Sequence, residues 1–160
     1  MSRLFGFTFT ACAAVAVATT AFAESHANPA LENATNARHA QMQVIGYHTG
    51  ILGDMAKGTT PYDAEIATAA AENLASAAAM NRITLWIAGS EQGAIAGSRA
   101  KAEIWTDPAG FDEKAVGLET ASAAMVTAAG TDLDALRAAM GGVGESCGAC
   151  HKAYRGAKVK

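Results

Sequence analysis

Cysteine is scarce in this chain, and an excess of positive charge is absent. Only three cysteines occur among 160 residues, and one of them, Cys12, lies in a segment that we expect to be removed. Exported domains that rely on disulfides usually have several cysteine pairs, so Cys147 and Cys150 alone do not predict a disulfide scaffold. The formal net charge is −3, which provides no global basic field for nucleic acid. We therefore expect no nucleic-acid partner.

Aromatic residues are also few where the fold has to form. Four of the five phenylalanines lie in the first 23 residues, at positions 5, 7, 9 and 22. The rest of the chain has one phenylalanine, Phe111, two tryptophans and three tyrosines among many alanines. Alanine favours helices but fills little volume, whereas protein interiors pack as densely as organic crystals. This composition predicts that something other than side chains occupies part of the core.

The first residues have the features of a secretory signal peptide. Arg3 supplies a positive start, residues 4–20 are mostly apolar and uncharged, and Ala21-Phe22-Ala23 is a small-x-small cleavage site. We expect cleavage after Ala23, so that residues 1–23 are removed and residues 24–160 form one domain in the periplasm. The alternative is an uncleaved membrane anchor, because the apolar run is nearly long enough to span a bilayer.

The prolines and the capping residues predict four helices. Each of the three prolines follows a residue that commonly caps a helix N-terminus, and Thr131 followed by Asp134 resembles a capping box. The other predicted caps with their first helical residues are Asn28-Pro29, Thr60-Pro61 and Asp107-Pro108. The helices should cover residues 29–56, 61–81, 108–129 and 132–155, with a glycine-punctuated crossover loop over residues 86–99.

Apolar residues repeat at steps of three and four along the predicted helices. In the last one, Leu133, Leu136, Met140, Val143 and Cys147 follow this pattern. Steps that average 3.5 residues are typical of left-handed bundle packing. The sequence has no alternating pattern typical of a β-strand, so we predict an all-α fold, an antiparallel four-helix bundle.

Cys147-Gly148-Ala149-Cys150-His151 has the spacing of a c-type haem attachment sequence. The two cysteines share a helix face, where each can form a thioether with one vinyl group of the porphyrin. His151 follows Cys147 by four residues, which directs its imidazole at the iron as the proximal ligand. A thioredoxin-like redox pair needs a strand–helix context, and a structural zinc site usually has a second ligand pair. The motif predicts one covalently bound haem c near the C-terminal helix.

A haem motif at the end of a four-helix bundle resembles the class II c-type cytochromes, the cytochrome c′ family. Further segments resemble this family: Arg38 to Met42, Lys57-Gly58 with Pro61-Tyr62-Asp63, Glu103 to Asp107, and Val143-Gly144 with Cys147 to Arg155. The resemblance implies an up-down bundle with the haem wedged between its helices. It also implies that Trp86 lies beside the haem edge and that Arg155 belongs to the haem-binding end.

Arg38 and Met42 are the candidate haem contacts on the first helix. Arg38 lies on the apolar stripe, where an unpaired charge is costly, so we expect a haem propionate as its partner. The alternative is a surface arginine whose stem lies along apolar side chains. The resemblance places Met42 at the distal position, and we expect its thioether, a soft ligand, to bind the iron. The alternatives are a core methionine that only covers the iron and His39 as the distal ligand.

We predict a periplasmic electron carrier, and not an enzyme, because no nucleophile–base constellation is present. The alternative is a five-coordinate cytochrome c′ that binds NO or CO as a gas sink or sensor. A bundle without haem is the least favoured interpretation. Expected partners are periplasmic or membrane-bound redox proteins, and an acidic one would be steered by Lys152, Arg155, Lys158 and Lys160. The resemblance also implies a homodimer.

Overall fold

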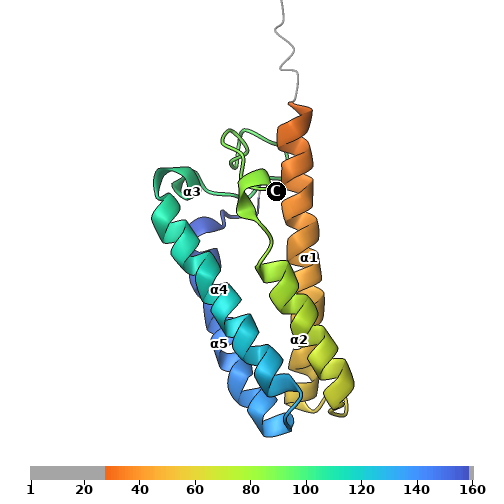
Figure 1. Cartoon of the computed structure of the whole chain (residues 1–160). Helices are drawn as coiled ribbons and strands as arrows, with labels where there is room; N and C mark the ends of the chain where they lie inside the picture. Colours follow the sequence, from red (N-terminus) through yellow and green to blue (C-terminus); the bar gives the residue numbers. More distant parts are fainter. Residues whose placement is uncertain (1–27, 159–160) are drawn as a thin grey trace, which may run out of the picture.

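A computed structural model describes residues 28–158 of the chain. Four long helices run side by side: α1 (Pro29–Lys57), α2 (Ala64–Ala78), α4 (Pro108–Ala129) and α5 (Leu133–Tyr154) (Figure 1). The connection from α2 to α4 contains a 3₁₀ turn, η1 (Arg82–Thr84), and one helical turn, α3 (Glu103–Thr106). Only isolated bridges, and no strands, occur in the described part of the chain. The predicted all-α four-helix bundle is confirmed.

Two of the proline-marked helix starts lie where the sequence predicts them. The side chain of Asn28 accepts a hydrogen bond from the backbone N–H of Ala30 at 3.1 Å, and α1 begins at Pro29. Asp107 likewise accepts from the backbone N–H three residues later at 3.1 Å, and α4 begins at Pro108. In both helices proline occupies the first position, where its missing N–H leaves no hydrogen bond unmade.

The predicted bounds of the second helix are wrong at both ends. α2 begins at Ala64 and not at Pro61, because the carboxylate of Asp63 accepts hydrogen bonds from the backbone N–H groups two and three residues later, both at 3.0 Å. It ends at Ala78, before the predicted end at position 81. Asn81 instead caps η1, since its side chain accepts from the backbone N–H two residues later. An acidic side chain is as good a cap as the predicted Thr60.

The cap of the last helix is Asp132 and not Thr131. The carboxylate of Asp132 accepts a hydrogen bond from the backbone N–H of Ala135 at 2.8 Å. The hydroxyl of Thr131 donates backwards to the carbonyl of Thr127, so this residue is bonded to the end of α4. The span of α5 differs from the prediction of residues 132–155 by one residue at each end.

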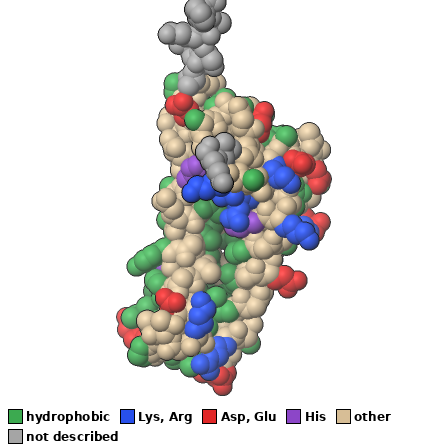
Figure 2. Space-filling model, turned by 180° about the vertical axis from the view of Figure 1, so that it is seen from behind, with side chains coloured by type: hydrophobic (Ala, Val, Ile, Leu, Met, Phe, Trp, Pro, Cys, Tyr) green, Lys and Arg blue, Asp and Glu red, His purple; other side chains and the backbone are tan. Residues whose placement is uncertain are grey.

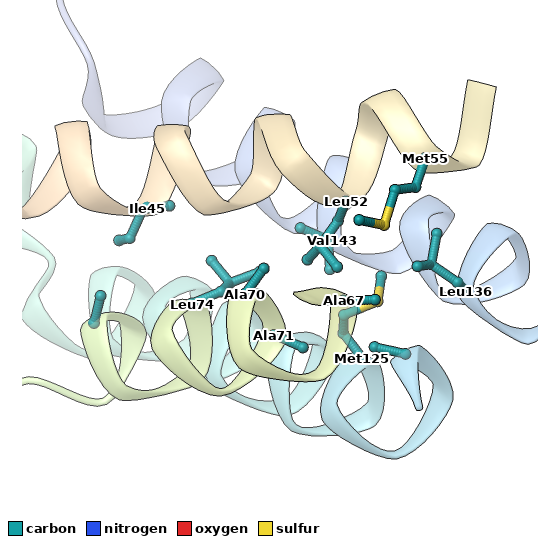
Figure 3. Close-up of a cluster of buried hydrophobic side chains, with 12 residues drawn as sticks. Ile45, Leu52, Met55, Ala67, Ala70, Ala71, Leu74, Met125, Leu136 and Val143 are labelled. Atoms are coloured by element: carbon teal, nitrogen blue, oxygen red, sulfur yellow. The ribbon is translucent and has the colours of Figure 1, made fainter. Parts of the chain in front are cut away.

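The main apolar core joins all four long helices. Leu52, Leu74, Met125, Leu136 and Val143 are fully buried in it (Figure 3). α2 contributes mainly alanines to this core, and small side chains allow helices to pack at short interaxial distances. A second, smaller cluster forms near α3, where Trp86 packs against Ala100, Ile104, Phe111 and Tyr154.

The predicted crossover loop is confirmed, and glycines shape it. Gly89 and Gly97 have φ angles of 88° and 78°, a region that residues with a Cβ rarely adopt. Each is followed by a buried serine, and the hydroxyl of Ser98 donates to the carbonyl of Ser90 at 2.7 Å. This bond holds the two turns of the loop together beside α1.

The segment predicted to be a signal peptide, residues 1–23, lies outside the described residues. None of the helices within residues 28–158 is long and apolar enough to cross a membrane.

Candidate functional site

A cavity of about 480 Å³ lies between α1, α4, α5 and the crossover loop. Its walls include Ile45 from the main core and Phe111 and Tyr154 from the second cluster, so it separates the two apolar clusters. Its volume is in the range of pockets that hold cofactors, about 300–1,000 Å³. All seven predicted site residues line it: Arg38, Met42, Trp86, Cys147, Cys150, His151 and Arg155.

α5 contributes the attachment motif to one wall of this cavity. Cys147 and Cys150 are free, half-buried thiols, and burial raises the pKa of both. Burial, followed by the positive charges of Arg155 and Arg99, lowers the pKa of the His151 imidazole. A neutral imidazole has a free nitrogen lone pair, which is the form that binds a metal ion.

α1 contributes Met42 and Gly46 to the cavity, one helical turn apart. Met42 is 40% exposed and belongs to the cavity wall. A Cβ added at Gly46 would meet no atom within 4 Å, so this part of α1 leaves room for a group held in the cavity. His39, the alternative distal ligand, also lines the cavity but is exposed.

Arg38 is buried, which contradicts the alternative of a surface arginine. Only 4% of the residue is exposed, and its guanidinium donates to the carbonyl of Leu85 at 2.8 Å. It also donates to the hydroxyl and carbonyl oxygens of Ser90 and to the hydroxyl of Thr35, at 2.7–3.0 Å. Burial lowers the pKa of Arg38, and no carboxylate in the described part of the chain pairs with it. A buried cation without an anion needs a negative group nearby.

Trp86 joins Arg38 to the aromatic side of the cavity. The guanidinium carbon of Arg38 lies 4.8 Å from the centre of the Trp86 ring. Trp86 meets Phe111 edge to face with ring centres 4.8 Å apart, and Phe111 meets Tyr154 in the same way at 5.4 Å. Trp105 donates its ring N–H to the Trp86 carbonyl at 3.1 Å and thereby supports this wall.

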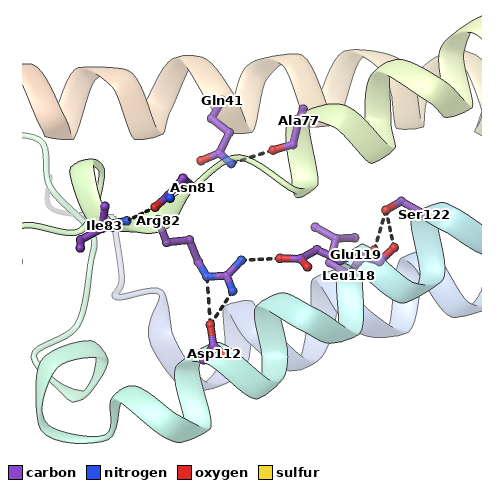
Figure 4. Close-up of polar contacts among 9 residues, drawn as sticks. All are labelled: Gln41, Ala77, Asn81, Arg82, Ile83, Asp112, Leu118, Glu119 and Ser122. Carbon is purple, nitrogen blue, oxygen red and sulfur yellow. Dashed lines mark hydrogen bonds and ion pairs between the residues drawn. The ribbon is translucent and has the colours of Figure 1, made fainter.

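Arg82 and Arg99 line the cavity too, although neither is among the predicted site residues. Arg82 pairs with Asp112 and Glu119 of α4 and connects the crossover to that helix (Figure 4). Arg99 donates from Nε to the carbonyl of Gly156 at 2.9 Å. Neither residue belongs to a helical repeat or a motif that would predict a place in the site. The one available indication was that Arg99 is a cation in a glycine-rich loop.

The residues of the cavity fit a haem c. Four arginines line it, and none of its lining residues is an Asp or a Glu, which favours an anionic group such as a pair of propionates. The hydroxyl oxygen of Thr49, another lining residue, is buried and has no hydrogen-bond partner within residues 28–158. Cys147 and Cys150 would hold the porphyrin, His151 would bind the iron, and Arg38 and Arg99 would face the carboxylates.

Comparisons with known proteins agree with the assignment of this cavity to a haem c. The family model described as Cytochrome C′ matches residues 33–155. Cytochrome c-554 of Cereibacter sphaeroides is 43% identical over 125 residues, which cover 78% of this chain and 82% of that protein. A cytochrome c′ of the same organism is 36% identical over 124 residues, covering 78% of this chain and 83% of that protein.

Solved structures show the same similarity. Cytochrome c′ from Rhodobacter sphaeroides superposes with a TM-score of 0.77 at 35% identity, covering 80% of this chain and 98% of that one. A nitric oxide complex of a cytochrome c prime variant from Alcaligenes xylosoxidans has a TM-score of 0.71 at 36% identity, and the match covers 80% of this chain and 97% of that one. The match over nearly all of the described residues shows that the chain belongs to the cytochrome c′ family of class II c-type cytochromes, which hold one covalently attached haem c.

Proposed function

We propose that this protein binds NO or CO at its haem, on the side of the cavity formed by Met42 and Gly46. The observation that carries the proposal is that the α1 wall of the cavity consists of Met42 and Gly46, a movable side chain and a residue without one. A diatomic ligand needs little room, and a side chain with three rotatable bonds can move aside for it. The nitric oxide complex of the relative from Alcaligenes xylosoxidans supports the same proposal.

Haem c supplies an iron that changes between the ferric and ferrous states and that binds NO or CO when ferrous. The chain's own residues attach, orient and shield this group. Cys147 and Cys150 would fix it to α5, and His151 would supply a neutral imidazole on that side. Trp86 and Phe111 would give it an aromatic wall, while Arg38 would supply positive charge without an acidic partner of its own.

A second candidate is the predicted one-electron carrier, in which Met42 binds the iron and leaves no position for a gas. The observation that favours it is the place of a thioether in the cavity wall, since sulfur is a soft ligand for haem iron. In either case we propose a binding or redox protein and not an enzyme, exported to the periplasm after removal of residues 1–23. The homodimer implied by the family resemblance stays a prediction.

The optical spectrum of the purified protein before and after addition of CO tests the proposal. We expect a high-spin spectrum that shifts with CO, and the Met42→Leu variant should give the same type of spectrum. Met80→Leu is the matched control, because Met80 is similarly exposed and does not line the cavity. A low-spin spectrum that ignores CO, and that becomes CO-sensitive only in Met42→Leu, would overturn gas binding and establish Met42 as a ligand.

A further inference from the structure

We infer that five cations at the cavity entrance form a docking surface for an acidic redox protein that exchanges one electron with the haem. This basic surface consists of Arg99, Lys101, Lys152, Arg155 and Lys158. The inference goes beyond the proposed function and holds for both candidates, because a gas-binding protein must also receive an electron to bind CO. The step moves one electron from the reduced partner to the ferric iron. It forms no bond and moves no proton.

Backbone and side-chain bonds hold the two halves of the basic surface together. Residues 99–101 come from the connection between α2 and α4, and residues 152–158 come from the end of α5 and the segment after it. Ala100 and Arg155 form an antiparallel bridge, and the backbone N–H of Gly156 donates to the carbonyl of Arg99 at 2.7 Å. The ammonium of Lys101 donates to the carbonyl of Ala153 at 2.8 Å. The cations of both segments therefore lie side by side on one part of the molecule.

The charge of this surface is opposite to that of the rest of the chain. Of the twelve lysines and arginines, Arg3 and Lys160 lie outside the described residues, so the basic surface holds five of the remaining ten. The described residues include every acidic residue except Glu24, which gives fourteen. Figure 2 shows blue and purple side chains gathered in the upper half of this face, next to hydrophobic ones and with red side chains at one edge. A cationic patch on an acidic protein orients an approaching acidic partner.

Acidic side chains of the described residues engage few of the cations of this surface. Among the ion pairs within residues 28–158, only one involves this surface, the weak pair of Lys101 with Glu103 at 3.9 Å. Lys152, Arg155 and Lys158 are exposed and form none. The favourable interaction of cations with a helix C-terminus falls off within the last turn. It accounts for Lys152 but not for the loop residues.

The surface is also continuous with the cavity. Arg99 and Arg155 line the cavity together with His151, so the basic surface adjoins the redox site. Arg99 would also face a haem carboxylate, which leaves Arg155 and the lysines to meet the partner. The cavity wall beneath it is apolar at Ile104 and Phe111. An apolar centre with a charged rim is the usual anatomy of a protein–protein interface. An acidic protein with a matching rim therefore fits this surface.

The test measures electron transfer to the full holoprotein from reduced flavodoxin, used as an acidic one-electron donor protein. The test variant is Lys152→Glu combined with Lys158→Glu, neither of which lines the cavity. The control is Lys57→Glu at the last residue of α1. It lies beside the start of α5, where Arg137 bonds to the carbonyl of Ala56. The 18 residues from there to Arg155 span about 27 Å, well beyond the Debye length of about 10 Å at 0.1 M salt.

At an ionic strength of about 10 mM, we expect the double variant to react about tenfold more slowly and the control to change less than about twofold. At about 0.5 M salt the three proteins should react at the same rate, because salt screens exposed charges. Equal rates at low salt would overturn the inference, and so would a defect that persists at high salt. Binding to anionic phosphatidylglycerol vesicles that the double variant loses, with unchanged electron transfer, would instead assign the surface to a membrane. The CO spectrum of the same samples reports on the proposed function separately.

Discussion

Replacement of Arg38 with methionine separates the structural and electrostatic roles of the cavity's buried cation. Methionine keeps much of the apolar stem and removes the guanidinium. The four hydrogen bonds from Arg38 to Thr35, Leu85 and Ser90 are then lost. The contact with the Trp86 ring is lost as well.

The expected loss of stability depends on which hydrogen-bond partners of Arg38 keep another hydrogen bond in the variant. The hydroxyl of Thr35 still donates to the carbonyl of Leu31, and that of Ser90 still donates to the carbonyl of Ile87. The Ser90 carbonyl still accepts from Ser98. The carbonyl of Leu85 loses the partner it has in the intact protein. An unpaired buried acceptor costs about 1–3 kcal/mol, and loss of bonds to a charged donor adds to it, so we expect a total of about 3–4 kcal/mol.

Urea unfolding of the holoprotein, followed by helical circular dichroism, measures this cost. Gln41→Met is the matched control, since Gln41 is buried one turn further along α1 and donates one neutral hydrogen bond, to the carbonyl of Ala77 at 2.8 Å (Figure 4). We expect it to cost about 1–2 kcal/mol. Faster amide exchange confined to residues 85–99 in the Arg38 variant would locate the effect in the crossover loop. An Arg38→Met cost no larger than that of Gln41→Met would refute the reasoning.

Three further predictions concern the fold around the site. Leu74→Ala should destabilise the protein by about 2–5 kcal/mol in thermal or urea unfolding, because Leu74 is fully buried in the main core, and a smaller loss would mean that the helices close the gap. Asp63→Ala should cost about 1 kcal/mol while Thr60→Ala stays within about 0.5 kcal/mol, and equal effects would contradict the cap of α2. Burial and the hydrogen bond to Asp107 raise the pKa of Tyr154, so its contribution to stability is present below pH 10 and is lost as the pH rises above it. Tyr154→Phe should weaken this alkaline loss, and an unchanged pH profile of unfolding would argue against it.

The helix count and the attachment motif could be predicted because they depend on local chemistry. Asn28-Pro29 and Asp107-Pro108 act at their own positions, and each begins a helix where the sequence places it. The spacing of Cys147, Cys150 and His151 needs only a helix to bring the three residues to one wall. The start of α2 was misplaced because two capping residues, Thr60 and Asp63, compete within four positions. Propensity alone ranks them nearly equally.

The role of the crossover could not be predicted, because it depends on contacts between residues far apart in the sequence. Arg38 bonds to a carbonyl 47 residues away and to a serine 52 residues away, and Arg99 bonds to a glycine 57 residues away. Nothing in the spacing of the loop residues marks these partners. The apolar stripe predicts a propionate as the partner of Arg38, but it carries no sign that the same guanidinium also anchors the loop.

The scarcity of aromatic residues and the position of the cavity have a common explanation. Outside the first 23 residues the chain has only six aromatic side chains, and Trp86, Phe111 and Tyr154 are in contact with one another along one wall of the cavity. The main core is built from aliphatic side chains, methionines and many alanines, which pack closely where four helices meet. Between these two regions about 480 Å³ is left without side chains. A helix bundle this rich in alanine cannot close such a space with its own residues at native packing density, so the haem completes the hydrophobic core as well as supplying the redox-active iron.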